Sequence, residues 1–157
     1  MKKKKVLITG AYGRLAKYLI PLLVKKYLLF KIPKEKKGKK INLSIKKKVF
    51  EILDKVEPDY IINLAAFTDV SKCESNIIKA YESNYLIVKN ICNWIKIKKK
   101  GFLIQLSTDH LYDSNKSSRE NDISIKNVYA LTKYLGEIEA SGIASTILRV
   151  NFISRSD

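Results

Sequence analysis

The stretch Gly10-Ala11-Tyr12-Gly13-Arg14-Leu15-Ala16 follows the short apolar run Val6–Thr9 and opens an amphipathic segment. In a strand–glycine turn–helix unit, the backbone can approach a pyrophosphate, and the helix N-terminus faces its negative charge. We expect Gly10 to form the tight turn, Gly13 to allow the close approach, and the small Ala16 to pack the helix against the strand. A P-loop is excluded because no Gly-Lys-Ser/Thr follows. The stretch therefore favours a dinucleotide site.

The rest of the chain alternates short apolar runs with amphipathic stretches. The runs predict strands at Val6–Thr9, Tyr27–Ile32, Ile41–Leu43, Tyr60–Leu64, Phe102–Leu106 and Ser145–Val150. Helices are predicted at Arg14–Lys26 with a kink at Pro21, at 44–56 with Ser44 as the N-cap, at Ile77–Lys98 and at Val128–Ala140. Strands that alternate with helices, without period-two patterning, predict a parallel sheet covered on both faces. The fold class is α/β, a Rossmann-type doubly wound sheet.

A chain of 157 residues has room for one domain, which we place at 1–157. Its formal net charge of +16 comes almost wholly from lysine. Such a field suits nucleic acid or an acidic membrane, or it is a solvated background. The lysine runs fall in predicted loops and helix ends and contain no interleaved aromatic residues, so we favour the background and expect no specific nucleic-acid partner. An anionic small ligand would still benefit from the field.

Several other classes of protein are disfavoured. Gly10, Gly13 and Arg14 interrupt the N-terminal apolar run too early for a signal peptide, and no stretch has the apolar length of a membrane span. Cys73 and Cys92 are the only cysteines and lie in no C-x-x-C arrangement or His cluster. We therefore expect reduced thiols, a cytoplasmic location, and neither a metal site nor a membrane partner.

Two further patterns carry polar chemistry. Tyr129 and Lys133 lie four residues apart on a predicted helix, so the two side chains share one face. There the ammonium would lower the pKa of the phenol, which could then donate a proton to a carbonyl. Ser107, Thr108 and Asp109 end an apolar strand, where hydroxyls can orient a carbonyl substrate. Each pattern alone also fits a purely structural role; the combination with the glycine turn gives them weight.

Four blocks of the chain resemble the dTDP-4-dehydrorhamnose reductase family. Residues 63–74 (NLAAFTDVSKCE) resemble its NAAAYTAVDKAE stretch, and 106–113 (LSTDHLYD) resemble STDYVFDG. Residues 128–137 (VYALTKYLGE) resemble YGxSKLxGE, and 147–150 (ILRV) resemble ILRTSW. The resemblance covers the front part of the family pattern. It implies reduction of a nucleotide-linked 4-keto-6-deoxy sugar for cell-surface polysaccharide synthesis; nucleotide-sugar epimerases and dehydratases share the first and last motifs.

The resemblance also implies roles for the catalytic residues. Tyr129 would protonate the sugar C4 oxygen, while Lys133 lowers its pKa and holds the nicotinamide ribose. Thr108 would polarise the keto group, and Asp109 would face the substrate. Asn84 matches an asparagine of the long helix that supports the active site.

Other positions match the cofactor-binding residues of the family. The pyrophosphate would be lined by Gly10, Gly13, Arg14 and Leu15. The cofactor would pass along Ala65, Ala66, Phe67 and Thr68, and its adenine would contact Asn42 and Leu43. Tyr129 and Lys133 would contact its nicotinamide end.

The chain also departs from the family pattern. Asn42 replaces the usual aspartate, and Lys34, Lys36 and Lys37 lie near the end of the second predicted strand. Because basic residues there suit a 2′-phosphate, we expect NADPH as the cofactor, with NADH as the alternative. Phe152 stands where the family has a substrate-facing tryptophan. In the family a C-terminal substrate subdomain follows, which we expect to be missing here. The expected partners are a nucleotide sugar and either a second copy of the chain or a complementing C-terminal fragment. If no such fragment is supplied, the alternative is that the chain is a cofactor-binding domain without activity of its own.

Overall fold

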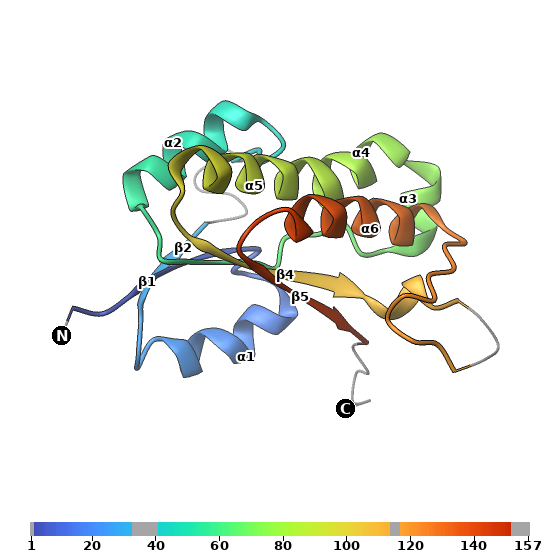
Figure 1. Cartoon of the computed structure of the whole chain (residues 1–157), viewed down its shortest axis with the longest axis horizontal. Helices are drawn as coiled ribbons and strands as arrows, with labels where there is room; N and C mark the ends of the chain where they lie inside the picture. The colour runs from blue at the N-terminus through green and yellow to red at the C-terminus, as the bar shows by residue number, and fades with distance from the viewer. Residues whose placement is uncertain (1, 33–40, 114–116, 152–157) are drawn as a thin grey trace.

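Parallel strands form one sheet in the computed structural model, which describes residues 2–32, 41–113 and 117–151 (Figure 1). The strands are β1 (Lys5–Thr9), β2 (Leu28–Lys31), β3 (Tyr60–Asn63), β4 (Phe102–Thr108) and β5 (Ser145–Val150). Their order in the sheet is β2-β1-β3-β4-β5, and every neighbouring pair is parallel. The predicted α/β class with a doubly wound parallel sheet is confirmed.

Helices lie on both faces of this sheet. They are α1 (Arg14–Leu23), α2 (Lys46–Val56), α3 (Val70–Ser75), α4 (Ile77–Tyr81), α5 (Ile87–Lys98) and α6 (Val128–Ser141), with a π-helical turn η1 (Glu82–Leu86) and a 3₁₀ turn η2 (Asp109–Leu111). Figure 1 shows α1 on one side of the sheet and α2, α5 and α6 on the other. None of the helices in the described residues has the length and apolar character needed to span a membrane.

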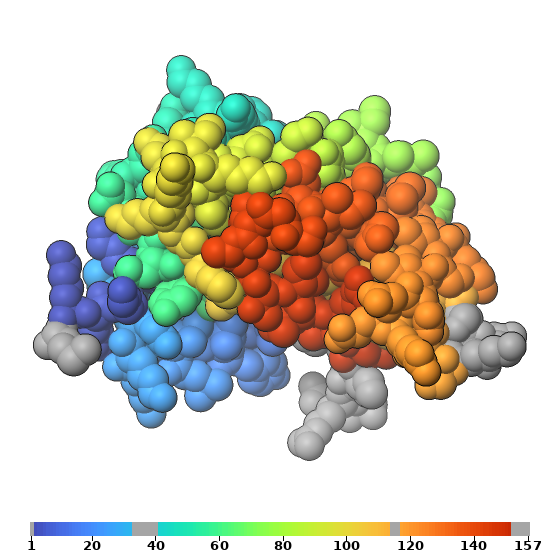
Figure 2. All heavy atoms as spheres, viewed as in Figure 1, coloured from blue at the N-terminus to red at the C-terminus, as the bar shows by residue number. Residues whose placement is uncertain are grey.

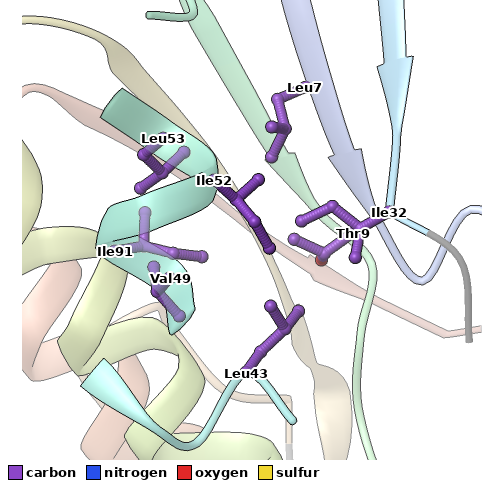
Figure 3. A pocket seen from close by; sticks show the side chains of 8 residues that line it. All are labelled: Leu7, Thr9, Ile32, Leu43, Val49, Ile52, Leu53 and Ile91. Carbon is purple, nitrogen blue, oxygen red and sulfur yellow. The ribbon is translucent and has the colours of Figure 1, made fainter. Parts of the chain in front are cut away.

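The larger hydrophobic core lies between the sheet and the α2–α5–α6 layer. Leu7, Ile61 and Leu103, which are neighbours across three strands, point into it and are almost fully buried. Trp94 of α5 is almost fully buried in it and donates a hydrogen bond from Nε1 to the exposed Asp54, 2.8 Å away. Figure 3 shows a small apolar hollow in this core. Its volume of about 10 Å³ is at most that of one water molecule, so it is an imperfection of packing and not a ligand site.

A smaller core lies under α1. Val6 and Ile8 of β1, Ile62 of β3 and Ala11 of the glycine turn are buried there. Ala16 is fully buried, as expected for the small residue that joins helix to strand. In space-filling form, the N-terminal segments (blue) lie at the lower left of the view, and the segments near the C-terminal end of the described chain (red) lie near its centre (Figure 2).

The chain direction places the carboxyl ends of β1, β3 and β4 side by side. From β1 the chain crosses to β2 on one side, whereas β3, β4 and β5 are added on the other. The strand order therefore reverses between β1 and β3. Ligands of open α/β sheets bind at such a switch point, beyond the carboxyl ends of the strands.

Several boundaries differ from the sequence predictions. Residues 41–43 form no strand, and Asn90 of α5 instead donates hydrogen bonds to the backbone carbonyls of Leu43 and Ser44. Ser44 does not cap α2; the N-cap is Ile45, and the Ser44 hydroxyl donates to Asn42. The first helix contains Pro21 and ends at Leu23, three residues early. The predicted helix 77–98 is interrupted by η1, and β4 continues through Thr108.

Candidate active site

The glycine turn has the predicted geometry. Gly10 has φ +60°, and a Cβ there would lie 2.7 Å from the backbone of Leu64 and Ala65. Gly13 donates its N–H to the Gly10 carbonyl and is the N-cap of α1, with no side-chain cap and no acidic residue in the first turn of the helix. Arg14 is exposed and Leu15 is half-buried. The α1 N-terminus therefore presents backbone N–H groups and a cation to any anion above the turn.

Residues 64–68 leave β3 beside this turn and are held by Asn84. The Asn84 Oδ1 accepts from the Phe67 N–H at 2.8 Å, and its Nδ2 donates to the Phe67 carbonyl at 3.0 Å. The same Nδ2 lies 3.1 Å from Thr132 Oγ1 of α6. Asn84 is buried in the π-turn η1, where the extra residue of a π-helix redirects side chains. Asn84 thus links the segment of Ala65, Ala66 and Thr68 to α6.

The start of α6 is fixed by two caps. The Asn127 side chain accepts from the Ala130 N–H at 2.7 Å. Glu74 of α3 accepts from the Val128 N–H at 2.6 Å. Because Tyr129 lies in this first turn, both caps also determine where its side chain points.

The structure brings Thr108 and Tyr129 together. Thr108, the last residue of β4, is 1% exposed and lies close enough to the buried phenol of Tyr129 to lower its pKa. The His110 ring packs edge-on against the Tyr129 ring, with a centroid distance of 5.6 Å. Asp109 lies next to this pair, with its Oδ1 3.4 Å from Thr108 Oγ1.

Burial sets the protonation of Tyr129. The pKa of its phenol is raised, first because the ring is desolvated, while the hydrogen bond with Thr108 acts in the opposite direction. The charges of Cys73 and Asp109 raise this pKa further. We expected the charge of Lys133 to lower this pKa, but desolvation dominates and the pKa is raised. The phenol is therefore protonated at neutral pH, the form that a proton donor requires.

Lys133 is buried one turn further along α6. Its Nζ donates a hydrogen bond to the backbone carbonyl of Leu106 in β4. Desolvation lowers the pKa of Lys133 to about 8, against a smaller opposing effect of the Glu137 charge. Lys133 thus reaches the carboxyl end of the same strand that carries Thr108.

Some of the predicted site residues lie apart or outside the described residues. The Asn42 Oδ1 accepts from both the N–H and the hydroxyl of Ser44, which fixes the turn after β2, and Leu43 is buried in the core. Lys34, Lys36, Lys37 and Phe152 lie outside the residues that the structure describes. Residues 2–32, 41–113 and 117–151 contain no group of His, Cys, Asp and Glu side chains that could hold a metal ion.

The sequence and the fold of this chain are similar to those of known proteins. Residues 4–155 match the family model described as the RmlD substrate binding domain. The match covers nearly the whole chain. The chain belongs to the RmlD substrate-binding domain family.

Individual proteins named as dTDP-4-dehydrorhamnose reductases are also similar to this chain. A dTDP-4-dehydrorhamnose reductase of Aggregatibacter actinomycetemcomitans is 31% identical over 138 residues, covering 85% of this chain and 45% of the relative. The crystal structure of a hypothetical dTDP-4-dehydrorhamnose reductase from Sulfolobus tokodaii is 36% identical with a TM-score of 0.83, covering 92% and 55%. The NADP complex of the Bacillus anthracis reductase has a TM-score of 0.84 at 24% identity, covering 95% and 54%. The chain spans about half the length of the curated relatives it matches.

The structure also contains functional candidates that the sequence analysis of this RmlD-family chain missed. Gln105 lies fully buried between Asn63 and the Leu106 carbonyl to which Lys133 binds. Glu137, four residues after Lys133, forms a buried ion pair with Arg149. A glutamine inside an apolar strand and a third polar residue at four-residue spacing after Tyr129 and Lys133 were the signals that could have indicated them.

The buried ammonium of Lys133 predicts a pH dependence of stability. The pKa of Lys133 in the folded chain is about 8, against the ordinary lysine value of 10.5, so between these pH values the unfolded chain retains a proton that the folded chain has lost. Stability therefore rises with pH in this window, and below it the buried charge costs up to about 3 kcal/mol. We expect urea unfolding of wild type to show this rise between pH 8 and 10.5, and the Lys133→Met variant to lack it. Parallel pH profiles for the two proteins would contradict the assignment.

Proposed function

We propose that this chain is the cofactor-binding part of an NADPH-dependent reductase that acts on nucleotide-linked 4-keto-6-deoxy sugars, in the synthesis of cell-surface polysaccharide. One observation carries the proposal. Near the switch point, the glycine turn follows β1, and Thr108, with Tyr129 and the ammonium of Lys133 beside it, lies at the carboxyl end of β4, on the same edge of the sheet.

Features of the site fit a dinucleotide. Gly10 lets the turn pack directly against the backbone of Leu64 and Ala65, where a Cβ would lie 2.7 Å away, and the exposed Arg14 supplies positive charge at the start of α1. The hydroxyl of Ser107 is buried and has no hydrogen-bond partner within the described residues. A buried hydroxyl of this kind is normally paired, so its free capacity suits a ligand group.

The chemistry divides between cofactor and chain. A bound NADPH supplies the hydride. Thr108 would orient the keto oxygen, and the protonated phenol of Tyr129 would transfer its proton to that oxygen as negative charge develops. The ammonium of Lys133 would hold the nicotinamide ribose and stabilise the tyrosinate that remains.

The choice of NADPH over NADH rests on charge. Asn42 places an amide where the family pattern has an aspartate, so no carboxylate of that residue repels a 2′-phosphate. The nearby lysines Lys34, Lys36 and Lys37 would attract it. The Bacillus anthracis reductase, whose fold this chain shares, is described in complex with NADP.

A second candidate is a cofactor-binding domain that turns over no substrate by itself. It is favoured by the observation that the chain spans about half of its curated relatives. The partner of such a domain would be a polypeptide that supplies the substrate-binding part, or a second copy. Tight NADPH binding without turnover would distinguish it from the complete reductase.

Calorimetric titration with NADPH and NADH tests cofactor binding. We expect binding of both, with NADPH tighter. Arg14→Glu, which reverses a charge beside the turn, should weaken NADPH binding about tenfold or more. Lys55→Glu makes the same charge change on an exposed residue near the C-terminal end of α2, away from the turn, and should change the affinity less than about twofold.

The outcomes of this titration separate the claims. Failure of the folded chain to bind either nucleotide would exclude the dinucleotide site. An equal loss of affinity in Arg14→Glu and Lys55→Glu would show that net charge, and not the glycine turn, attracts the cofactor. Equal affinity for NADH would remove only the argument from Asn42 and the lysines.

A further inference from the structure

A row of buried polar side chains crosses the sheet just below its carboxyl edge. Thr9, Asn63 and Gln105 are register partners on β1, β3 and β4, and each is 1% exposed. The Thr9 hydroxyl donates to Asn63 Oδ1 at 2.5 Å, and Asn63 Nδ2 donates to Gln105 Oε1 at 2.8 Å. Burying three polar side chains costs free energy unless each one has a hydrogen-bond partner. All three are paired here, which indicates that the row has a structural or functional role.

The row ends on the carbonyl of Leu106. Gln105 Nε2 donates to this oxygen at 2.7 Å, and Lys133 Nζ donates to the same oxygen. The ladder between β3 and β4 stops at the pair Asn63–Gln105, so Leu106 has no partner in β3. Leu106 is paired with Leu148 of β5, and two side chains, those of Gln105 and Lys133, converge on its carbonyl oxygen.

The other end of the row reaches the glycine turn. Thr9 immediately precedes Gly10, and its Oγ1 accepts from the N–H of Ala65 at 3.2 Å. The row thus connects the two segments that would line the cofactor, after β1 and after β3, with the lysine that would hold its nicotinamide ribose.

We propose that Gln105 is a positioning residue for Lys133: together with Asn63 it fixes the Leu106 carbonyl, on which the ammonium of Lys133 is seated beside the nicotinamide end of the cofactor. The inference rests on the proposed function, because it assigns Lys133 to the ribose. A lysine side chain has many rotamers. If its ammonium is already held in place before the ribose binds, less conformational entropy is lost on binding.

Substitution of Gln105 tests this role. Gln105→Met has a similar length but can neither accept from Asn63 nor donate to the Leu106 carbonyl. Leu103→Met is the matched control, because Leu103 is fully buried two residues earlier on the same strand and face. Each protein is titrated with NADPH and with 2′,5′-ADP, which contains the adenine end of the cofactor but lacks the nicotinamide ribose.

We expect Gln105→Met to raise the Kd for NADPH about five- to tenfold, the effect of one misplaced charged hydrogen bond. Its Kd for 2′,5′-ADP should change less than about twofold. Leu103→Met should leave both affinities unchanged. Equal weakening of the two ligands by Gln105→Met, or no weakening, would overturn the inference. A wild-type chain that binds neither ligand would instead refute the proposed function.

A measurement on the unmodified chain covers the case in which Gln105→Met does not fold. Below pH 8, NMR should show the Lys133 ammonium protected from exchange with water and coupled through its hydrogen bond to the Leu106 carbonyl carbon. A freely exchanging ammonium without that coupling would overturn the inference.

Discussion

Tyr129→Phe is expected to reduce NADPH oxidation about 10²–10⁴-fold in an enzyme restored by supplying the second half of the family fold, fused or in trans. The substitution removes the buried hydroxyl beside Thr108 and leaves the buried ring in place. NADPH affinity should therefore be nearly unchanged, and the loss should appear in kcat. The assay follows NADPH absorbance with a dTDP-4-keto-6-deoxy sugar.

Two comparisons make this prediction specific. Tyr134→Phe removes a phenol from the same helix, and should leave the rate within about twofold because Tyr134 has no proposed role in the site. The 157-residue chain alone should oxidise NADPH negligibly, because much of the grip that orients the sugar is expected from the second half. A restored enzyme indifferent to Tyr129→Phe would show that the acid is misassigned. Robust turnover by the chain alone would contradict the need for a second half.

Arg149→Met is expected to destabilise the fold by about 3–5 kcal/mol. The Arg149 guanidinium binds the Glu137 carboxylate through Nε and Nη2, at 2.6 to 3.1 Å, and Glu137 is 4% exposed. Nη1 also donates to the Tyr112 hydroxyl and to the Glu120 carbonyl, both at 2.6 Å. The substitution leaves the buried carboxylate uncompensated and releases the segment between η2 and α6.

Urea unfolding measures this loss. Lys4→Met breaks the exposed pair of Lys4 with Asp59, and should cost less than about 1 kcal/mol. The double variant Glu137→Gln/Arg149→Met should recover part of the stability, because no charge is then left buried without its partner. A cost for Arg149→Met no larger than that for Lys4→Met would contradict the role of the pair.

The sequence predicted the fold where one pattern dominated. The alternation of apolar runs and amphipathic segments placed the strands near their observed positions, with β5 at the predicted 145–150. The prediction failed for 41–43, because these residues look like a strand locally but are held by side-chain hydrogen bonds from Asn90. It also missed the π-turn η1, in which the buried Asn84 accepts from the Phe67 N–H, because the residue pattern gives no sign of this turn.

The candidate site was predicted in part. Short motifs identified the glycine turn, Thr108, Tyr129 and Lys133, because backbone geometry and strand ends limit where such residues lie. Motifs carry no information on burial, so the expected lowering of the Tyr129 pKa was wrong in direction. Gln105 was missed because Asn63, which donates to its side chain, lies 42 residues earlier in the sequence, on β3.

A crystal structure of this chain grown with NADPH tests the central claim most directly. The account predicts the pyrophosphate over Gly10–Leu15 at the N-terminus of α1, with the nicotinamide ribose against Lys133 and the nicotinamide beside Thr108 and Tyr129. NADPH bound elsewhere, for example on the exposed lysines of Lys96–Lys100 at the opposite edge of the sheet, would contradict it.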